Sequence, residues 1–119
     1  MKICVTSQGA DPSAAVDSRF GRCPYFLIYD DDAETFTAID NANNMNAAGG
    51  AGVQSASRVA EQGVDWVVSG HIGPKAMAVL DAAGLKVAVG AEGTVADAIA
   101  ALKAGGLQQV HEADRPQHW

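Results

Sequence analysis

The chain has 119 residues, of which 18% are charged, and its formal net charge is −6. This length fits one domain with one core, and the absence of any Lys/Arg cluster argues against a nucleic-acid partner or a membrane-surface helix. No apolar run approaches the roughly 20 residues of a membrane span, and the N-terminal residues are too few and too polar for a signal peptide. We therefore expect a cytoplasmic protein.

Three strands and one long loop are expected in the first third of the chain. A short apolar run ends in Ser7-Gln8-Gly9, which is typical of a buried strand followed by a loop. The loop carries glycines and prolines and sustains no helical period. Two strand-like segments then flank an acidic turn, which predicts a hairpin. The predicted strands are residues 2–7, 24–30 and 34–40, and the loop is residues 9–24.

Helices and strands alternate in the rest of the chain. Each predicted helix has apolar residues at helical spacing and ends at a glycine. Pro74 stands at a first helical position, and Thr94 with Asp97 has the spacing of a capping box. The predicted helices cover residues 51–62, 74–83 and 94–104, and the predicted strands between them cover residues 64–70 and 85–89.

The resulting order, β-β-β-α-β-α-β-α, predicts an α/β fold: a three-layer α/β/α sandwich on a mixed, five-stranded sheet. The strand–helix–strand unit over residues 64–89 implies parallel strands with a right-handed crossover, and the hairpin adds an antiparallel strand. We expect one domain over residues 1–105 and a loosely held C-terminal tail over residues 106–119.

An anion-binding pocket is predicted where the parallel strands end. Ligands of open α/β sheets collect at the carboxyl ends of the strands, which here are Ser7-Gln8-Gly9, Ser69-Gly70-His71 and Val89-Gly90-Ala91. Helices that begin at Gly73-Pro74 and near the Gly-rich stretch 49–52 would direct backbone N–H groups toward an anion. Lys75 adds a positive charge near one of these helix ends.

Several chemistries have no support in the sequence. No Gly-Lys-Ser/Thr loop is present for a nucleotide, and the acidic residues 30–32 fall in a hairpin turn, away from the strands where a hydrolase would need them. His71, His111 and His118 show no metal-ligand spacing. Cys4 and Cys23 are too few for an ordinary iron–sulfur cluster, and we expect Cys4 in the core and Cys23 as a packing residue.

Residues 19–30, Arg-Phe-Gly-Arg-Cys-Pro-Tyr-Phe-Leu-Ile-Tyr-Asp, resemble the front motif of the nitrogenase iron–molybdenum cofactor biosynthesis accessory family. That family includes NifX and the C-terminal part of NifB. The small-residue segment 47–60 and the segment 70–76, followed by residues 80–87, match it as well. The resemblance covers roughly residues 1–105, and within the family the chain looks most similar to the orange-protein branch of sulfate-reducing bacteria.

The resemblance implies a ribonuclease-H-like fold and a non-enzymatic carrier of a preformed, anionic molybdenum–copper sulfide cluster, held non-covalently. It also implies association with MinD-like ATPases. Many members carry His before Phe-Gly-Arg, whereas this chain has Arg19, which suits an anion through charge and hydrogen bonds. The expected cofactor-binding residues are Arg19, Arg22, Asn43, Asn44, Met45, Gly49, Gly50, Gly52, His71, Ile72, Gly73 and Lys75, with no protein ligand to the metal.

Two other interpretations stay open at this point. One is a small regulatory module that senses an anion or a phosphorylated metabolite and docks on a partner ATPase. The other is an enzyme of the nuclease or phosphatase class, which the missing carboxylates disfavour. Met45 has two interpretations of its own: a side chain that folds back on the core, or a soft thioether that caps a metal sulfide.

Overall fold

The computed structural model describes residues 1–42 and 51–111 and confirms the predicted three-layer fold. The predicted strands and helices are all present, with bounds that shift by a few residues at most. The strands are β1 (Lys2–Ser7), β2 (Tyr25–Asp30), β3 (Thr35–Asp40), β4 (Trp66–Val68), β5 (Lys86–Val89) and β6 (Gln108–Val110), and the helices are α2 (Ala51–Ala60), α3 (Pro74–Ala82) and α4 (Val95–Lys103).

The sheet has the strand order β3-β2-β1-β4-β5-β6. As predicted, β1, β4 and β5 are parallel to one another and β2 and β3 form an antiparallel hairpin. The prediction of five strands was wrong by one, because β6 pairs antiparallel with β5. Its sequence, Gln-Gln-Val, has one apolar residue and is too short to show a strand period. The strand forms because its backbone pairs with β5 and Val110 packs on the core.

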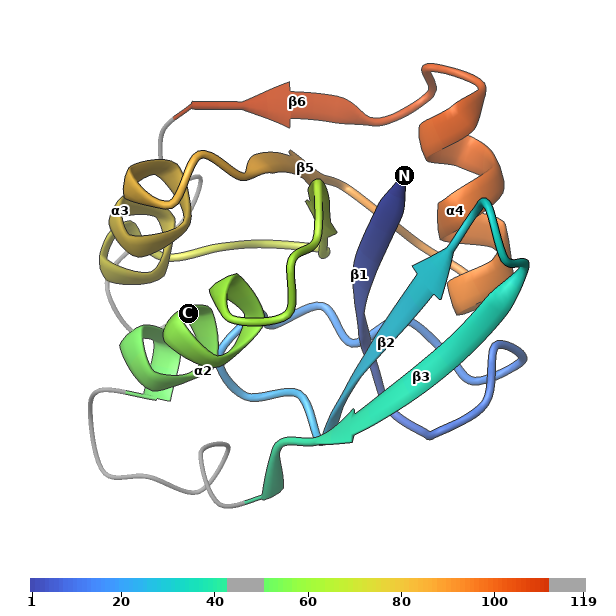
Figure 1. The fold of residues 1–119 in the computed structure, drawn as a ribbon, viewed down its shortest axis with the longest axis horizontal. Helices are drawn as coiled ribbons and strands as arrows, with labels where there is room; N and C mark the ends of the chain where they lie inside the picture. The colour runs from blue at the N-terminus through green and yellow to red at the C-terminus, as the bar shows by residue number, and fades with distance from the viewer. Residues whose placement is uncertain (43–50, 112–119) are drawn as a thin grey trace.

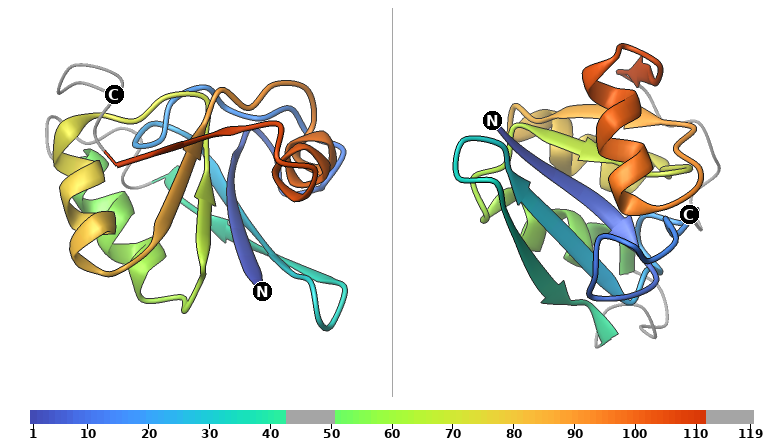
Figure 2. Two further views of the ribbon diagram at one scale, coloured as in Figure 1. Left: turned by 90° about the horizontal axis from the view of Figure 1, so that it is seen from above. Right: turned by 90° about the vertical axis from the view of Figure 1, so that its right-hand side faces the viewer.

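Two helices cover one face of the sheet and the third covers the other (Figures 1 and 2). Side chains of β1 alternate between the layers, as the strand period of two requires. Cys4 points into the core under α2 and α3, whereas Ile3 and Val5 point into the core under α4. Among the described residues, no helix has the length and apolar character that a membrane crossing needs.

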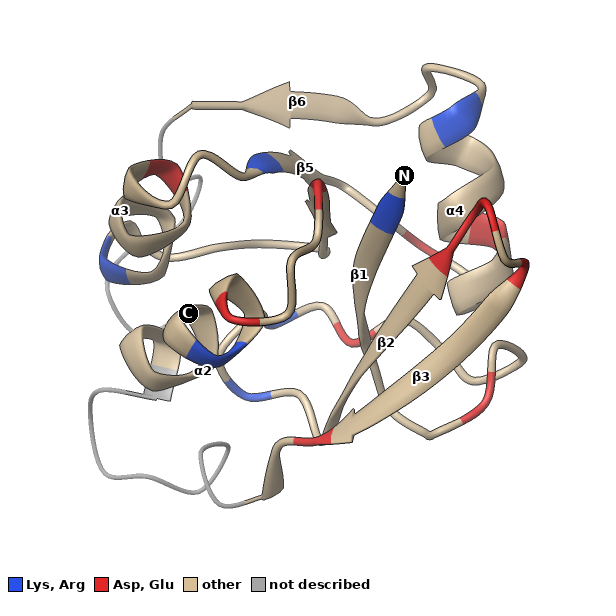
Figure 3. Ribbon diagram, viewed as in Figure 1, with Lys and Arg blue, Asp and Glu red and all other residues tan. Residues whose placement is uncertain are grey.

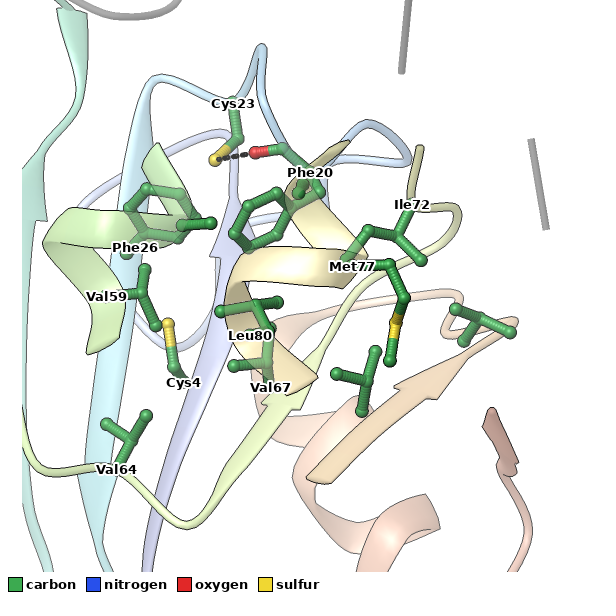
Figure 4. Packing of buried hydrophobic residues seen from close by; sticks show 14 of the residues in the cluster. Cys4, Phe20, Cys23, Phe26, Val59, Val64, Val67, Ile72, Met77 and Leu80 are labelled. Atoms are coloured by element: carbon green, nitrogen blue, oxygen red, sulfur yellow. Dashed lines mark hydrogen bonds between the residues drawn. The ribbon is translucent and has the colours of Figure 1, made fainter. Parts of the chain in front are cut away.

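The core under α2 and α3 also holds part of the long loop before β2 (Figure 4). Phe20 is fully buried and its ring centroid lies 5.4 Å from that of Phe26 in β2. Leu80 of α3 and Val67 of β4 belong to the same cluster. A buried aromatic side chain contributes about 1.5–3 kcal/mol through burial alone, so Phe20 anchors the loop to the body of the domain.

Candidate anion-binding site

The loop between β1 and β2 is fastened across the ends of two neighbouring parallel strands. The amide of Asp17 donates to the carbonyl of Thr6 in β1 (3.0 Å), and the Thr6 hydroxyl donates to the carbonyl of Asp17 (2.7 Å). The amide of His71, just beyond β4, donates to the carbonyl of Ser18 (2.8 Å). The loop therefore lies at the edge where the sequence predicted a ligand.

Gly70 lets the loop approach β4 this closely. A Cβ on Gly70 would lie 2.7 Å from the Cα of Ser18 and 2.9 Å from its carbonyl oxygen. Real Cβ atoms do not approach backbone atoms to such distances, so any larger residue would push the loop away. Glycine at the end of β4 is thus a steric condition for the site.

Arg19 and His71 are brought together by backbone pairing. The two residues form an isolated parallel bridge, and the amide of Phe20 donates to the carbonyl of His71 (3.3 Å). The Arg19 side chain is 49% exposed, while the carboxylate beside it, Asp17, has a side chain only 4% exposed. Two residues far apart in the sequence therefore present a cation and an imidazole at one edge.

The beginnings of α3 and α4 differ in a way that matters for an anion. Thr94 and Asp97 form the predicted capping box at α4: the Thr94 hydroxyl accepts from the Asp97 amide (3.1 Å), and the Asp97 carboxylate accepts from the Thr94 amide (3.0 Å). These hydrogen bonds lower the pKa of Asp97. The Asp97 carboxylate therefore already places a negative charge at the beginning of α4. In the part of the chain that the structure describes, no side chain caps α3 at Gly73, so α3 is the better anion acceptor.

A buried polar network holds the second half of the loop. The Asn41 side chain donates to the carbonyl of Cys23 (2.9 Å), and the Ser55 hydroxyl donates to Asn41 (3.3 Å) and lies 3.5 Å from the carbonyl of Gly21. Asn41 and Ser55 are both fully buried. These residues and Asp17 were not predicted from the sequence, because an isolated polar residue carries no periodic signal that it will be buried.

The structure places the remaining predicted site residues unevenly. Gly73 is buried at the start of α3, Lys75 is exposed in its first turn, and Arg22 is partly buried in the loop. Ile72 is fully buried in the core, so its side chain packs inside the domain and is not exposed to a ligand. Gly52 lies where α2 approaches α3, since a Cβ there would be 3.4 Å from that of Ala76. The predicted residues that fall outside the described ranges are Asn43, Asn44, Met45, Gly49 and Gly50.

The described residues offer no protein ligand set for a metal ion, since no group of three His, Cys, Asp or Glu side chains gathers in them. Cys4 and Cys23 are fully buried, and burial raises the pKa of both thiols. The Cys23 thiol donates to the carbonyl of Phe20 (3.3 Å; Figure 4). Both side chains are therefore protonated at neutral pH and are poor metal ligands, because the thiolate is the ligating form.

These buried thiols predict that the protein loses stability in mild alkali. A thiol whose pKa is raised by folding contributes stability that is fully present below the unfolded pKa, about 8.5, and is lost as the pH rises above it. At pH 10 each thiol is expected to lower the free energy of unfolding by about 2 kcal/mol. Urea unfolding at pH 7, 8, 9 and 10 measures this loss. Cys23→Ala should show a shallower decline than the wild type, and parallel curves for the two proteins would contradict the assignment.

A depression of about 270 Å³ lies between α4 and the β2–β3 hairpin. It is at the other end of the strands, near the beginning of β1 and away from the carboxyl ends where the ligand is expected. It is lined by Tyr29, Phe36, Ala96, Ile99, Ala100 and Lys103. The ammonium of Lys103 is paired with Asp31. Acidic residues gather around the same hairpin turn (Figure 3). This depression is therefore mainly apolar and is surrounded by acidic residues, which makes it a poor place for an anion. The groups that could accept an anion lie instead at the carboxyl ends of the parallel strands.

Comparisons with known proteins identify the family and the fold of the chain. Residues 1–105 match the family described as dinitrogenase iron-molybdenum cofactor. The apo form of the orange protein from Desulfovibrio gigas is 31% identical, with a TM-score of 0.92 and 96% of each chain covered. A putative NifB protein from Thermotoga is 32% identical, with a TM-score of 0.83 and coverage of 96% of this chain and 97% of that chain. A putative dinitrogenase from Methanocaldococcus jannaschii, 16% identical with a TM-score of 0.69, covers 94% of this chain and 96% of that chain and shares the fold. A search of curated proteins finds no match.

Proposed function

The chain belongs to the dinitrogenase iron-molybdenum cofactor family, and we propose that it is a non-enzymatic, cytoplasmic carrier of a preformed molybdenum–copper sulfide cluster. The cluster is anionic and is held non-covalently at the strand-end edge. Delivery to or from a MinD-like ATPase belongs to the same proposal, because the family resemblance implies that class of partner.

The observation that carries the proposal is the pairing of Arg19 with His71 beside the beginning of α3. Arg19 supplies a half-exposed guanidinium with several N–H donors. The start of α3 supplies backbone N–H groups and the positive end of the helix dipole. A cluster that brings its own sulfides needs such donors and positive charge, and it needs no thiolate from the protein.

The chemistry of the described residues also favours carriage over catalysis. A nuclease or phosphatase would need carboxylates that converge on a metal ion, whereas Asp17 is the buried carboxylate at this edge and is engaged with Arg19. Both thiols are protonated and enclosed, as their burial and raised pKa values indicate, so neither is placed to act as a nucleophile. What the edge offers is positive charge with hydrogen-bond donors.

Reconstitution tests the proposal. The apo protein is mixed with tetrathiomolybdate and Cu(I), freed of unbound metal by gel filtration, and analysed by visible spectroscopy and elemental analysis. We expect a coloured protein with molybdenum and copper bound in fixed proportion. Arg19→Gln should weaken retention at least about tenfold, because a hydrogen bond to a charged group contributes about 1.5–3 kcal/mol.

Two variants serve as controls for this experiment. Lys86→Gln removes the same charge at the opposite edge, where Lys86 lies over the ring of Trp66, and should retain the cluster. Cys23→Ala should retain it as well, because the thiol takes no part in binding. A wild-type protein that elutes colourless and metal-free would refute the carrier function. Stabilisation of that colourless protein by phosphorylated metabolites would instead support the regulatory module.

A further inference from the structure

Asp17 is an unexpected neighbour for an anion site. Its side chain is 4% exposed and its Oδ1 lies 3.5 Å from Nε of Arg19. The same oxygen accepts a hydrogen bond from the Arg19 amide (2.9 Å). The Asp17 backbone is in turn held by two hydrogen bonds to Thr6. The carboxylate is therefore fixed to β1, and the guanidinium that it faces is the movable partner.

The turn at Arg19 does not by itself require a negative charge. Accepting the Arg19 amide needs only an oxygen, which Asn or Ser would supply in the same kind of turn. A site built solely to hold an anion gains nothing from a buried carboxylate, which repels the anion and neutralises the nearest cation. The negative charge of Asp17 thus acts on Arg19 and, through Arg19, on the anion that Arg19 binds.

Cys23 lies in the same electrostatic neighbourhood as Asp17 and Arg19. Burial is the largest cause of the raised pKa of its thiol, Asp17 raises that pKa further, and Arg19 lowers it. Both charges therefore act on the buried region beneath the loop. In the described ranges, Asp17 is the ion-pair partner of Arg19.

We propose that Asp17 is a built-in counter-anion for Arg19, which competes with the bound cluster and so sets how tightly the cluster is held and how readily it is released. This inference rests on the proposed function of the same edge. It assigns Asp17 as a positioning residue that acts through Arg19. In the empty site the pair is neutral, and an incoming polyanion must share the guanidinium with a carboxylate that cannot move away.

The test is a double-mutant cycle on Asp17 and Arg19. Asp17→Asn keeps the oxygen that accepts the Arg19 amide and removes the charge. We expect it to bind the reconstituted molybdenum–copper sulfide cluster about tenfold tighter than the wild type and to release it more slowly, a size typical of one unit charge near a protein surface. In the Arg19→Gln background the same change should alter affinity less than about twofold.

The outcomes separate this inference from the proposed function. A folded Asp17→Asn protein with unchanged or weaker cluster affinity would overturn the inference even if the wild type carries the cluster. If the wild type takes up no cluster, tetrathiomolybdate alone is titrated as a dianion. Tighter binding to Asp17→Asn than to the wild type then supports the counter-anion role, and equal binding overturns it. Asp17→Ser, whose hydroxyl also accepts the Arg19 amide, repeats each measurement if the buried amide prevents folding.

Discussion

Replacing Phe20 by alanine is expected to lower the free energy of unfolding by about 3–5 kcal/mol, the range typical of a buried phenylalanine. Phe20 is fully buried and packs against Phe26, so alanine would leave a cavity beneath the loop. The loop would also lose its main apolar anchor, and cluster retention should fall with stability. Chemical unfolding at pH 7 measures the first effect, and the reconstitution experiment measures the second.

Phe36 provides the matched control for this change. It is the same residue type, but it is 38% exposed on β3, where its ring contacts that of Tyr29. Phe36→Ala should cost clearly less than Phe20→Ala, because a partly exposed ring leaves no enclosed cavity when it is removed, and it should leave cluster retention unchanged. Similar losses for the two variants would mean that Phe20 is not an anchor of the kind described.

Gly70→Ala is the second change with a large expected effect, about 1–3 kcal/mol of lost stability, as is usual for overpacking. The new methyl group would meet the backbone of Ser18 at 2.7 Å, and a backbone cannot rotate away as a side chain can. The loop must therefore lift from the end of β4, which separates Arg19 from His71. Cluster retention is expected to fall further than the loss of stability alone would cause, because the site itself is displaced.

Hydrogen exchange gives a direct measure of this displacement. The amide of His71, which donates to Ser18 in the wild type, should exchange faster in Gly70→Ala under native conditions. Gly106→Ala is the control, because its nearest contact would be an ordinary 3.4 Å to the carbonyl of Ala101. Unchanged protection of the His71 amide would contradict the steric argument.

The fold was predictable because its main signals are local. The apolar run of β1, the hairpin, and the glycines that end α3 and α4 each rest on a few adjacent residues, and all were confirmed. The family resemblance is confirmed as well. The sixth strand was missed because β6 is defined by its pairing with β5 and by a single apolar residue, Val110.

The candidate site was predictable only in part. The rule that ligands collect at strand ends pointed to His71 and Gly73, and the family motif pointed to Arg19. Neither source indicated Asp17 or Asn41, because their importance depends on burial by segments distant in the sequence. Ile72 was expected among the cofactor-binding residues from the family resemblance, whereas its side chain is fully buried in the core.

The pairing of residue 19 with residue 71 is made by main-chain atoms alone. The position of residue 19 at this edge is consequently independent of which side chain it carries. The family resemblance implies His at this position in many members, whereas this chain has Arg19, and a bridge made by main-chain atoms does not depend on that difference. The backbone bridge therefore fixes the place of position 19, while the side chain at that position is left to determine the charge and the hydrogen-bond donors that the edge presents.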